Sequence, residues 1–403
     1  LRLALSDASH GVYMWSRPPP PSPPPPPPFA TMLPVVASVL VCWVLPFLLM
    51  RLVERRERAA LASTSAALRR QLCAAVRDIA TRSLPGDRCL ILSGGVDTCA
   101  ILAAAEEVGV SFAAGITVLT GDDSPDKEFA VAAATAHGLA HHVVFVTASD
   151  LVQTYLPQCA DSLHTFDGMT LRNSLVVAAA FRKARELGFK HAVVGDGADE
   201  LFGGYSFMWG CGDDLPQWRR KRDAMCAEWT FATAALAEMH GLRADGPFLE
   251  PGFVRWALAS TGRPECIGSR PIQLALGGPK VEHATGKVAL REAFATVASW
   301  RRKDPIEVGS GITVIGHDPF WAELISDEEY RAEAAALASR GYVIKNKEHL
   351  ANFRAFEAAL GRDGARHPTR KRLPVGQGCA GCCFDVGSAL FCDVCGAYPA
   401  TRS

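Results

Sequence analysis

The sequence has no excess of charge of either sign. Its 403 residues include 42 Lys and Arg residues and 42 Asp and Glu residues, so the formal net charge is +0. Proteins that bind nucleic acid through their overall charge carry a surplus of Lys and Arg, and this chain has none. The sequence also lacks an internal repeat of solenoid type. We therefore expect no nucleic-acid partner, and one or two ordinary globular domains in a chain that is 49% hydrophobic.

Charged side chains are also missing from residues 29–50. This segment follows a proline-rich run, which forms polyproline II or no fixed structure, so we expect a disordered tail over 1–28. An uncharged segment of this length is long enough to cross a bilayer as a helix. Four arginines follow it closely: Arg51, Arg55, Arg56 and Arg58. Because positive residues stay on the cytoplasmic side, we expect a membrane anchor whose catalytic domain faces the cytoplasm.

A cleaved signal or targeting peptide is the alternative interpretation of residues 29–50. Such peptides have a basic start and a cleavage site with small residues, whereas the small residues over 59–67 lie behind the charged run. If the segment is removed, the remaining chain would be a soluble protein of the cytoplasm or an organelle. Met32 is an alternative start of translation, which would leave out the proline-rich run.

A glycine turn lies between an apolar run, 88–92, and an alanine-rich segment, 99–107. This pattern predicts a strand, a turn and a helix, and the backbone N–H groups at such a helix start favour a phosphate. A carboxylate at Asp97 would repel that phosphate unless Mg²⁺ lies between them. The residues that we expect at ATP or pyrophosphate are Ser93, Gly94, Gly95, Asp97 and Thr98.

A second glycine-rich stretch, Gly195 to Tyr205, follows another short apolar run and supplies further carboxylates. Its sequence is Gly-Asp-Gly-Ala-Asp-Glu-Leu-Phe-Gly-Gly-Tyr. We expect Asp199 to complete the Mg²⁺ site together with Asp97, because Mg²⁺ is bound by carboxylate and phosphate oxygens. The two stretches together predict nucleotide chemistry.

Strand and helix patterns alternate from residue 88 to about residue 205, and a linking helix precedes them. The expected strands cover 88–92, 112–119, 142–147 and 191–194, and the expected helices cover 61–82, 125–137, 150–158 and 170–187. Alternation of this kind predicts an α/β fold with a parallel sheet flanked by helices. We expect a mainly helical second half over 215–360 and a small Cys-rich tail over 376–403.

Five of the 13 cysteines are concentrated in the last 25 residues. The pairs Cys379/Cys382 and Cys392/Cys395 have the spacing of two zinc knuckles, which predicts a tetrahedral Zn²⁺ site. Cys383 is left over or replaces Cys382. An iron–sulfur cluster, disulfides and a sulfur-transfer role are the alternatives. The eight scattered cysteines fit a reducing compartment.

The motifs carry a family resemblance over roughly residues 65–360. Ser93–Thr98 resembles the SGGxDS loop of the ATP pyrophosphatase superfamily, and Gly195–Tyr205 looks like the SGEGADELFGGY signature of the synthetase domain of asparagine synthetases. Further similar segments are 124–126, 141–142, 167–172, 286–291 and 301–303. The resemblance implies an adenine nucleotide α-hydrolase-like fold and a ligase domain, here bounded as 59–360. It also implies amide formation through an acyl-adenylate with pyrophosphate release, with aspartate as the default carboxylate.

Three residues are candidates for the chemistry itself. The resemblance supports Lys303 as the cation that stabilises the reacting α-phosphate, against a solvated charge run as the alternative. Asp196 is a candidate general base, or else an ordinary loop carboxylate. Arg172 is a candidate to orient a substrate carboxylate, or else forms a structural ion pair.

The sequence departs from the family pattern at three points. Asp196 stands where the bacterial and animal enzymes have Glu, and an acid, Asp245, stands where the family has Arg. No segment before residue 88 resembles the family's glutaminase domain, so we expect ammonia or a small amine as the nitrogen donor, or a separate glutaminase subunit. A tRNA-modifying ATP pyrophosphatase and a non-catalytic membrane scaffold are the alternative functions.

Overall fold

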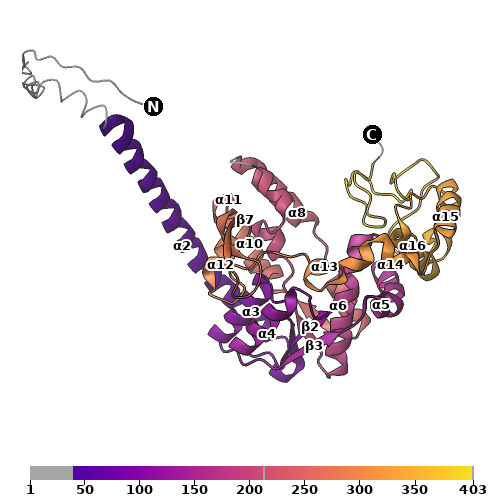
Figure 1. The fold of residues 1–403 in the computed structure, drawn as a ribbon, viewed down its shortest axis with the longest axis horizontal. Helices are drawn as coiled ribbons and strands as arrows, with labels where there is room; N and C mark the ends of the chain where they lie inside the picture. The colour runs from indigo at the N-terminus through magenta and orange to yellow at the C-terminus, as the bar shows by residue number, and fades with distance from the viewer. Residues whose placement is uncertain (1–39, 212–213, 402–403) are drawn as a thin grey trace, which may run out of the picture. The chain divides into compact units, whose positions relative to one another are not determined.

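The computed structural model describes residues 40–211 and 214–401 (Figure 1). The chain divides into two compact units, Leu1–Arg56 and Glu57–Ser403. The disordered tail predicted over 1–28 lies outside the described residues. A short π-helix, Leu40–Val44, leads into α2, Leu45–Ala80.

The membrane anchor predicted over 29–50 is wrong. Within the described part of the chain, no helix is both long enough and apolar enough to cross a membrane. In α2 the apolar run ends at Arg51, and further charged residues follow within two turns. Residues 29–39 of the predicted segment lie outside the described residues. The predicted localisation, which depends on this anchor, is therefore wrong as well.

A five-stranded sheet lies at the centre of the second unit, in the order β3-β2-β1-β4-β5. Every neighbouring pair in it is parallel. The strands are β1 (Arg88–Ile91), β2 (Ala114–Leu119), β3 (His141–Phe145), β4 (His191–Val193) and β5 (Arg243–Asp245). The predicted α/β class with a parallel sheet is confirmed, and β5 is the strand that the sequence pattern does not predict.

Helices cover both faces of this sheet (Figure 1). One face packs against α5 (Ala148–Leu163) and α6 (Gly168–Glu186), and the other against α2, α3 (Val96–Glu107) and α4 (Asp126–Ala136). Successive side chains of a strand point to opposite faces. Cys89 therefore lies in the apolar cluster with α5 and α6, and Leu90 lies in the cluster with α2, α3 and α4. Burial on both faces explains the continuous apolar runs in β1, β2 and β4.

The second half is mainly helical, as predicted. It also contains one β-hairpin that the sequence does not predict. The hairpin pairs β6 (Gly268–Gln273) with β7 (Lys280–Thr285) in antiparallel register. The helices are α7 (Ala198–Phe202), α8 (Leu215–Glu228), α9 (Thr233–Met239), α10 (Pro251–Ser260), α11 (Arg263–Cys266), α12 (Val288–Ala293), α13 (Ile306–Gly309), α14 (Asp318–Ala322), α15 (Asp327–Ser339) and α16 (Lys347–Leu360). Residues 365–401, all of them described, form neither helix nor strand.

Candidate active site

A cavity of about 490 Å³ lies at the carboxyl ends of the central strands. The chain proceeds from β1 outward to β2 and β3 and then returns to β4 on the other side of β1. In open α/β sheets, the crevice at such a reversal of strand order is where ligands bind. The loops that follow β1 and β4, which contain both glycine-rich stretches, line the cavity.

The loop after β1 turns directly into α3. Gly95 precedes the helix and gives it no side-chain cap, so the first N–H groups of α3 are left for an anion. The hydroxyls of Ser93 and Thr98 lie 3.3 Å apart, and both residues line the cavity. Gly94, with a φ of +69°, packs away from the cavity against α4. The segment therefore has the predicted order of strand, glycine turn and helix.

Lys287 joins the two glycine-rich stretches. Its Nζ lies 2.6 Å from Asp97 Oδ2 and 2.8 Å from Asp199 Oδ1, and Lys303 Nζ lies 2.7 Å from the same Asp199 oxygen. Burial opposes the charged form of Lys287, but the two carboxylates raise its pKa above the ordinary value. Burial likewise acts against Asp199, yet the two lysines lower its pKa to about 2.

The sequence analysis assigns no role to Lys287, although residues 286–291 are among the segments that resemble the family. The available signal was a lysine directly after a glycine in a family-like motif. Gly286 allows the close approach, because a Cβ there would lie 2.0 Å from the carbonyl oxygen of Gly203. The Lys287 N–H also donates to the Phe202 carbonyl at 2.9 Å. The backbone thus places Lys287 beside the end of α7.

Asp196 lies in the cavity wall near a second group of polar side chains. Its Oδ2 accepts a hydrogen bond from Thr233 Oγ1 at 2.5 Å. Burial raises the pKa of Asp196 to about 6, against the effect of that hydrogen bond, and neighbouring acids contribute. Tyr205 donates to Glu200 at 2.6 Å, and Lys303 Nζ lies 5.3 Å from the centre of the Tyr205 ring.

Two residues from the sequence analysis lie apart from this group. Arg172 does not line the cavity; its guanidinium lies 3.3 Å from Glu348 and 3.4 Å from Glu307. Asp245 also lies outside the cavity lining, and it pairs with Arg82 at 2.9 Å. The acid that replaces the family's Arg therefore sits in an ion-pair network rather than against a bound substrate.

Part of the cavity lining is apolar. It includes Ile116 and Val118 of β2 and Val176, Val177 and Ala180 of α6. Apolar side chains with a few polar groups are typical of pockets for small molecules. The cavity lining therefore combines apolar and charged side chains.

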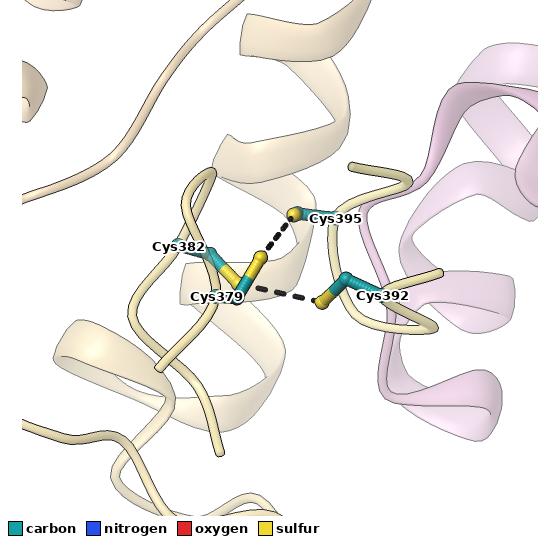
Figure 2. A group of neighbouring side chains, drawn as sticks. All are labelled: Cys379, Cys382, Cys392 and Cys395. Atoms are coloured by element: carbon teal, nitrogen blue, oxygen red, sulfur yellow. Dashed lines mark hydrogen bonds between the residues drawn. The ribbon is translucent and has the colours of Figure 1, made fainter. Parts of the chain in front are cut away.

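The four predicted zinc ligands come together in the Cys-rich tail (Figure 2). Their sulfur atoms all lie within 4.8 Å of one another, and all four side chains are buried. The Cys379–Cys395 and Cys382–Cys392 sulfur distances are 3.5 Å and 3.6 Å. A disulfide would need about 2.0 Å, and the cysteines are free. The sulfur of Cys383 is not part of the group, because it points to the Gly341 carbonyl at 3.4 Å.

Comparison with known proteins points to one family. A family model described as asparagine synthase matches residues 67–249. The glutamine-hydrolyzing asparagine synthetase of Asparagus officinalis is 31% identical over 132 residues, which are 30% of this chain and 21% of that protein. The Triphysaria versicolor enzyme is 30% identical over 190 residues, 42% of this chain and 31% of the relative. Asparagine synthetase B of Escherichia coli K12 is 28% identical over 262 residues, 56% of this chain and 42% of the relative. The chain thus spans about a fifth to two fifths of the length of these relatives.

Proposed function

We propose that this chain, whose residues 67–249 match a family model described as asparagine synthase, is an ATP-dependent ligase that forms an amide through an acyl-adenylate. The observation that carries the proposal is the charged group at the phosphate loop. Lys287 lies at hydrogen-bond distance from both Asp97 and Asp199, and Lys303 lies at the same distance from Asp199. Positioning and electrostatics are what phosphoryl and adenylyl transfer need from a protein.

The proposal assigns one orientation to ATP. Its phosphates would lie at Ser93–Thr98, where hydroxyls and the start of α3 supply donors, and its adenine against the apolar side chains of β2 and α6. Mg²⁺ fits Asp97 and Asp199, because Asp97 Oδ1 is buried without a hydrogen-bond partner among the described residues. Mg²⁺ bound there would neutralise part of the phosphate charge.

Two bond exchanges make up the proposed reaction. A carboxylate oxygen of the acid attacks the α-phosphorus, the bond to the bridging oxygen breaks, and pyrophosphate leaves. Lys303 stabilises the extra charge on the α-phosphoryl oxygens. An amine then attacks the acyl carbon, Asp196 accepts the amine's proton, and AMP leaves with the electron pair of the broken C–O bond.

The default substrates are aspartate and ammonia. The family resemblance makes aspartate the default substrate. Lys303, which lines the cavity, supplies a positive charge for the second carboxylate of aspartate. Glutamine would serve as nitrogen donor through a separate glutaminase subunit. Arg172 remains a predicted substrate ligand; its two ion pairs favour a structural role.

Zinc binding by Cys379, Cys382, Cys392 and Cys395 is a further part of the proposal. A tetrahedral site with Zn–S bonds of about 2.3 Å has sulfur–sulfur edges of about 3.8 Å. Two of the edges in the structure are 3.5 Å and 3.6 Å, and all four sulfur atoms lie within 4.8 Å of one another. The four thiols therefore need only small shifts to hold Zn²⁺.

The test is pyrophosphate release by the 403-residue chain given Mg·ATP, aspartate and ammonium, with the amide product measured alongside. We expect pyrophosphate and asparagine in equal amounts. Release that requires tRNA would favour a tRNA-modifying enzyme instead. No release with any of a panel of amino and dicarboxylic acids would favour a non-catalytic role and overturn the proposal.

A further inference from the structure

The second cysteine pair lies in a turn that rests on the N-terminal end of α6. Phe166 N–H donates to the Val394 carbonyl at 2.8 Å, and Thr165 Oγ1 donates to the Asp393 carbonyl at 2.7 Å. Both carbonyls belong to the two residues between Cys392 and Cys395. Thr165 and Phe166 are buried, so these hydrogen bonds are shielded from water.

The same turn touches the residue that caps α6. Asp167 Oδ2 accepts hydrogen bonds from Thr170 N at 2.9 Å and from Thr170 Oγ1 at 2.7 Å. A Cβ on Gly396 would lie 2.0 Å from Asp167 Oδ1, so the turn and the cap are in direct contact. Any displacement of the turn therefore moves or uncaps the start of α6.

The start of α6 is also a wall of the cavity. Thr170 and Asn173 line it, and the apolar lining residues Val176 and Val177 follow on the same helix. Asn173 Oδ1 is buried without a hydrogen-bond partner among the described residues. An unpartnered amide oxygen in the cavity wall is suited to accept a hydrogen bond from a nucleobase amino group.

The turn has little besides its cysteines to hold its shape. Residues 365–401 form neither helix nor strand, apart from a single bridge between Arg372 and Phe384. In small segments of this kind a structural metal supplies much of the folding free energy. Loss of the metal would leave the turn without a fixed position against Thr165 and Asp167.

We propose that Zn²⁺ held by the four cysteines fixes the N-terminal end of α6 and thereby sets the affinity of the cavity for ATP. The tail then acts on the nucleotide through position, with no sulfur atom in contact with it. The inference rests on the proposed function, because it takes ATP as the ligand of the cavity.

The first test compares zinc-loaded with metal-depleted protein. We expect one zinc per chain by elemental analysis, and binding of a non-hydrolysable ATP analogue that weakens at least tenfold on depletion and recovers on adding Zn²⁺. Cys392→Ser should behave like the depleted protein. Amide exchange should rise at 165–174 in the depleted form, whereas the central strand β1 should stay protected.

The second test leaves the thiols intact. Thr165→Val removes the hydroxyl that donates to the Asp393 and Val394 carbonyls of the tail and accepts from the Asp167 N–H, and Thr165→Ser keeps it. We expect the Val variant to keep its zinc but to bind the ATP analogue several-fold more weakly, with the Ser variant close to the parent. Thr135→Val, an exposed position on α4, is the matched control.

The outcomes separate the two proposals. If the zinc-loaded parent does not bind the analogue, the proposed function and this inference both fail. Equal affinity with and without zinc, or a Thr165→Val variant that binds as tightly as the parent, would overturn the inference and leave the ligase proposal standing.

Discussion

Asp196 differs from the other carboxylates of the cavity in its charge balance. Lys287 and Lys303 neutralise Asp199, whereas Asp196 has a neutral partner, Thr233, and its pKa is raised to about 6. A base must be ionised before it can accept a proton, so amide formation should rise as the pH increases through about 6. The rate of amide formation across pH 5 to 8, at saturating substrates, checks this expectation.

Asp196→Asn should separate the two halves of the reaction. We expect amide formation to fall by about 10²–10⁴, because a general base is lost. Aspartate-dependent exchange of labelled pyrophosphate into ATP should remain, since Lys303 and the phosphate loop are unchanged. An equal loss of both activities would contradict the assigned role.

Stability provides the control for that variant. The folded pKa of Asp196 is raised above 3.8, so ionisation costs stability; the stabilising effect of the proton is complete below pH 3.8 and is lost as pH rises through about 6. Asparagine carries no charge at pH 7. The variant should therefore unfold at least as high as the parent in thermal melts at that pH.

Lys303→Ala should slow pyrophosphate release. Removal of one electrostatic stabiliser of a transition state lowers a rate by about 10²–10³. Lys280→Ala, on the exposed strand β7, removes the same charge away from the cavity and should have no effect. Single-turnover pyrophosphate release measures both. Full activity in Lys303→Ala would exclude the lysine from the chemistry.

The sequence predicts part of this site and not the rest, for a physical reason. Ser93–Thr98 and Asp199 lie in short motifs whose local geometry depends on neighbouring residues. Lys287 contacts Asp97 from a distant part of the chain, and the glycine before it marks the segment without indicating which residue it contacts. Arg172 illustrates the opposite case: it lies in a motif-like segment but turns toward Glu307 and Glu348.

Among the secondary-structure elements, apolar runs predict four strands, of which β1, β2 and β4 are buried on both faces and the edge strand β3 is partly exposed. The apolar runs miss β5, whose side chains include Arg243 and Asp245. These residues hydrogen-bond to each other and Asp245 also pairs with Arg82, so the strand is stabilised by charge rather than by apolar burial. The β6–β7 hairpin is missed because β7 is exposed over most of its length and has no apolar alternation.

Gly286 lies between β7 and α12 and packs against the backbone at the end of α7. A substitution at Gly286 should show how much this close contact requires glycine. The Cβ of Gly286→Ala would collide with backbone of Gly203, which cannot move as a side chain can. We expect a loss of about 1–3 kcal/mol in unfolding free energy. Gly252→Ala, in α10 with nothing within 4 Å of the new Cβ, is the matched control. Urea denaturation of both variants measures the difference, and equal stability of the two would contradict the close contact.

For the molecule as a whole, the proposed nitrogen donor can be tested directly. The named relatives are glutamine-hydrolyzing synthetases, and this chain matches less than half of each. We expect the 403-residue chain alone to form amide from ammonium and not from glutamine. Product formation with each donor, at matched concentrations, is the measurement. Use of glutamine by the purified chain would show that it carries its own glutaminase activity.

The charged group at the phosphate loop also has a consequence for how ligands arrive. Asp97 and Asp199 contribute two negative charges, and Lys287 and Lys303 two positive ones, so the group is neutral before anything binds. With a chain of net charge +0, little potential extends beyond the Debye length of about 8 Å at physiological salt. The protein therefore attracts a polyanion electrostatically only at short range, when the two are in contact. Nucleotide capture should proceed at an unsteered diffusional rate that ionic strength changes little, and selectivity should reside in dissociation.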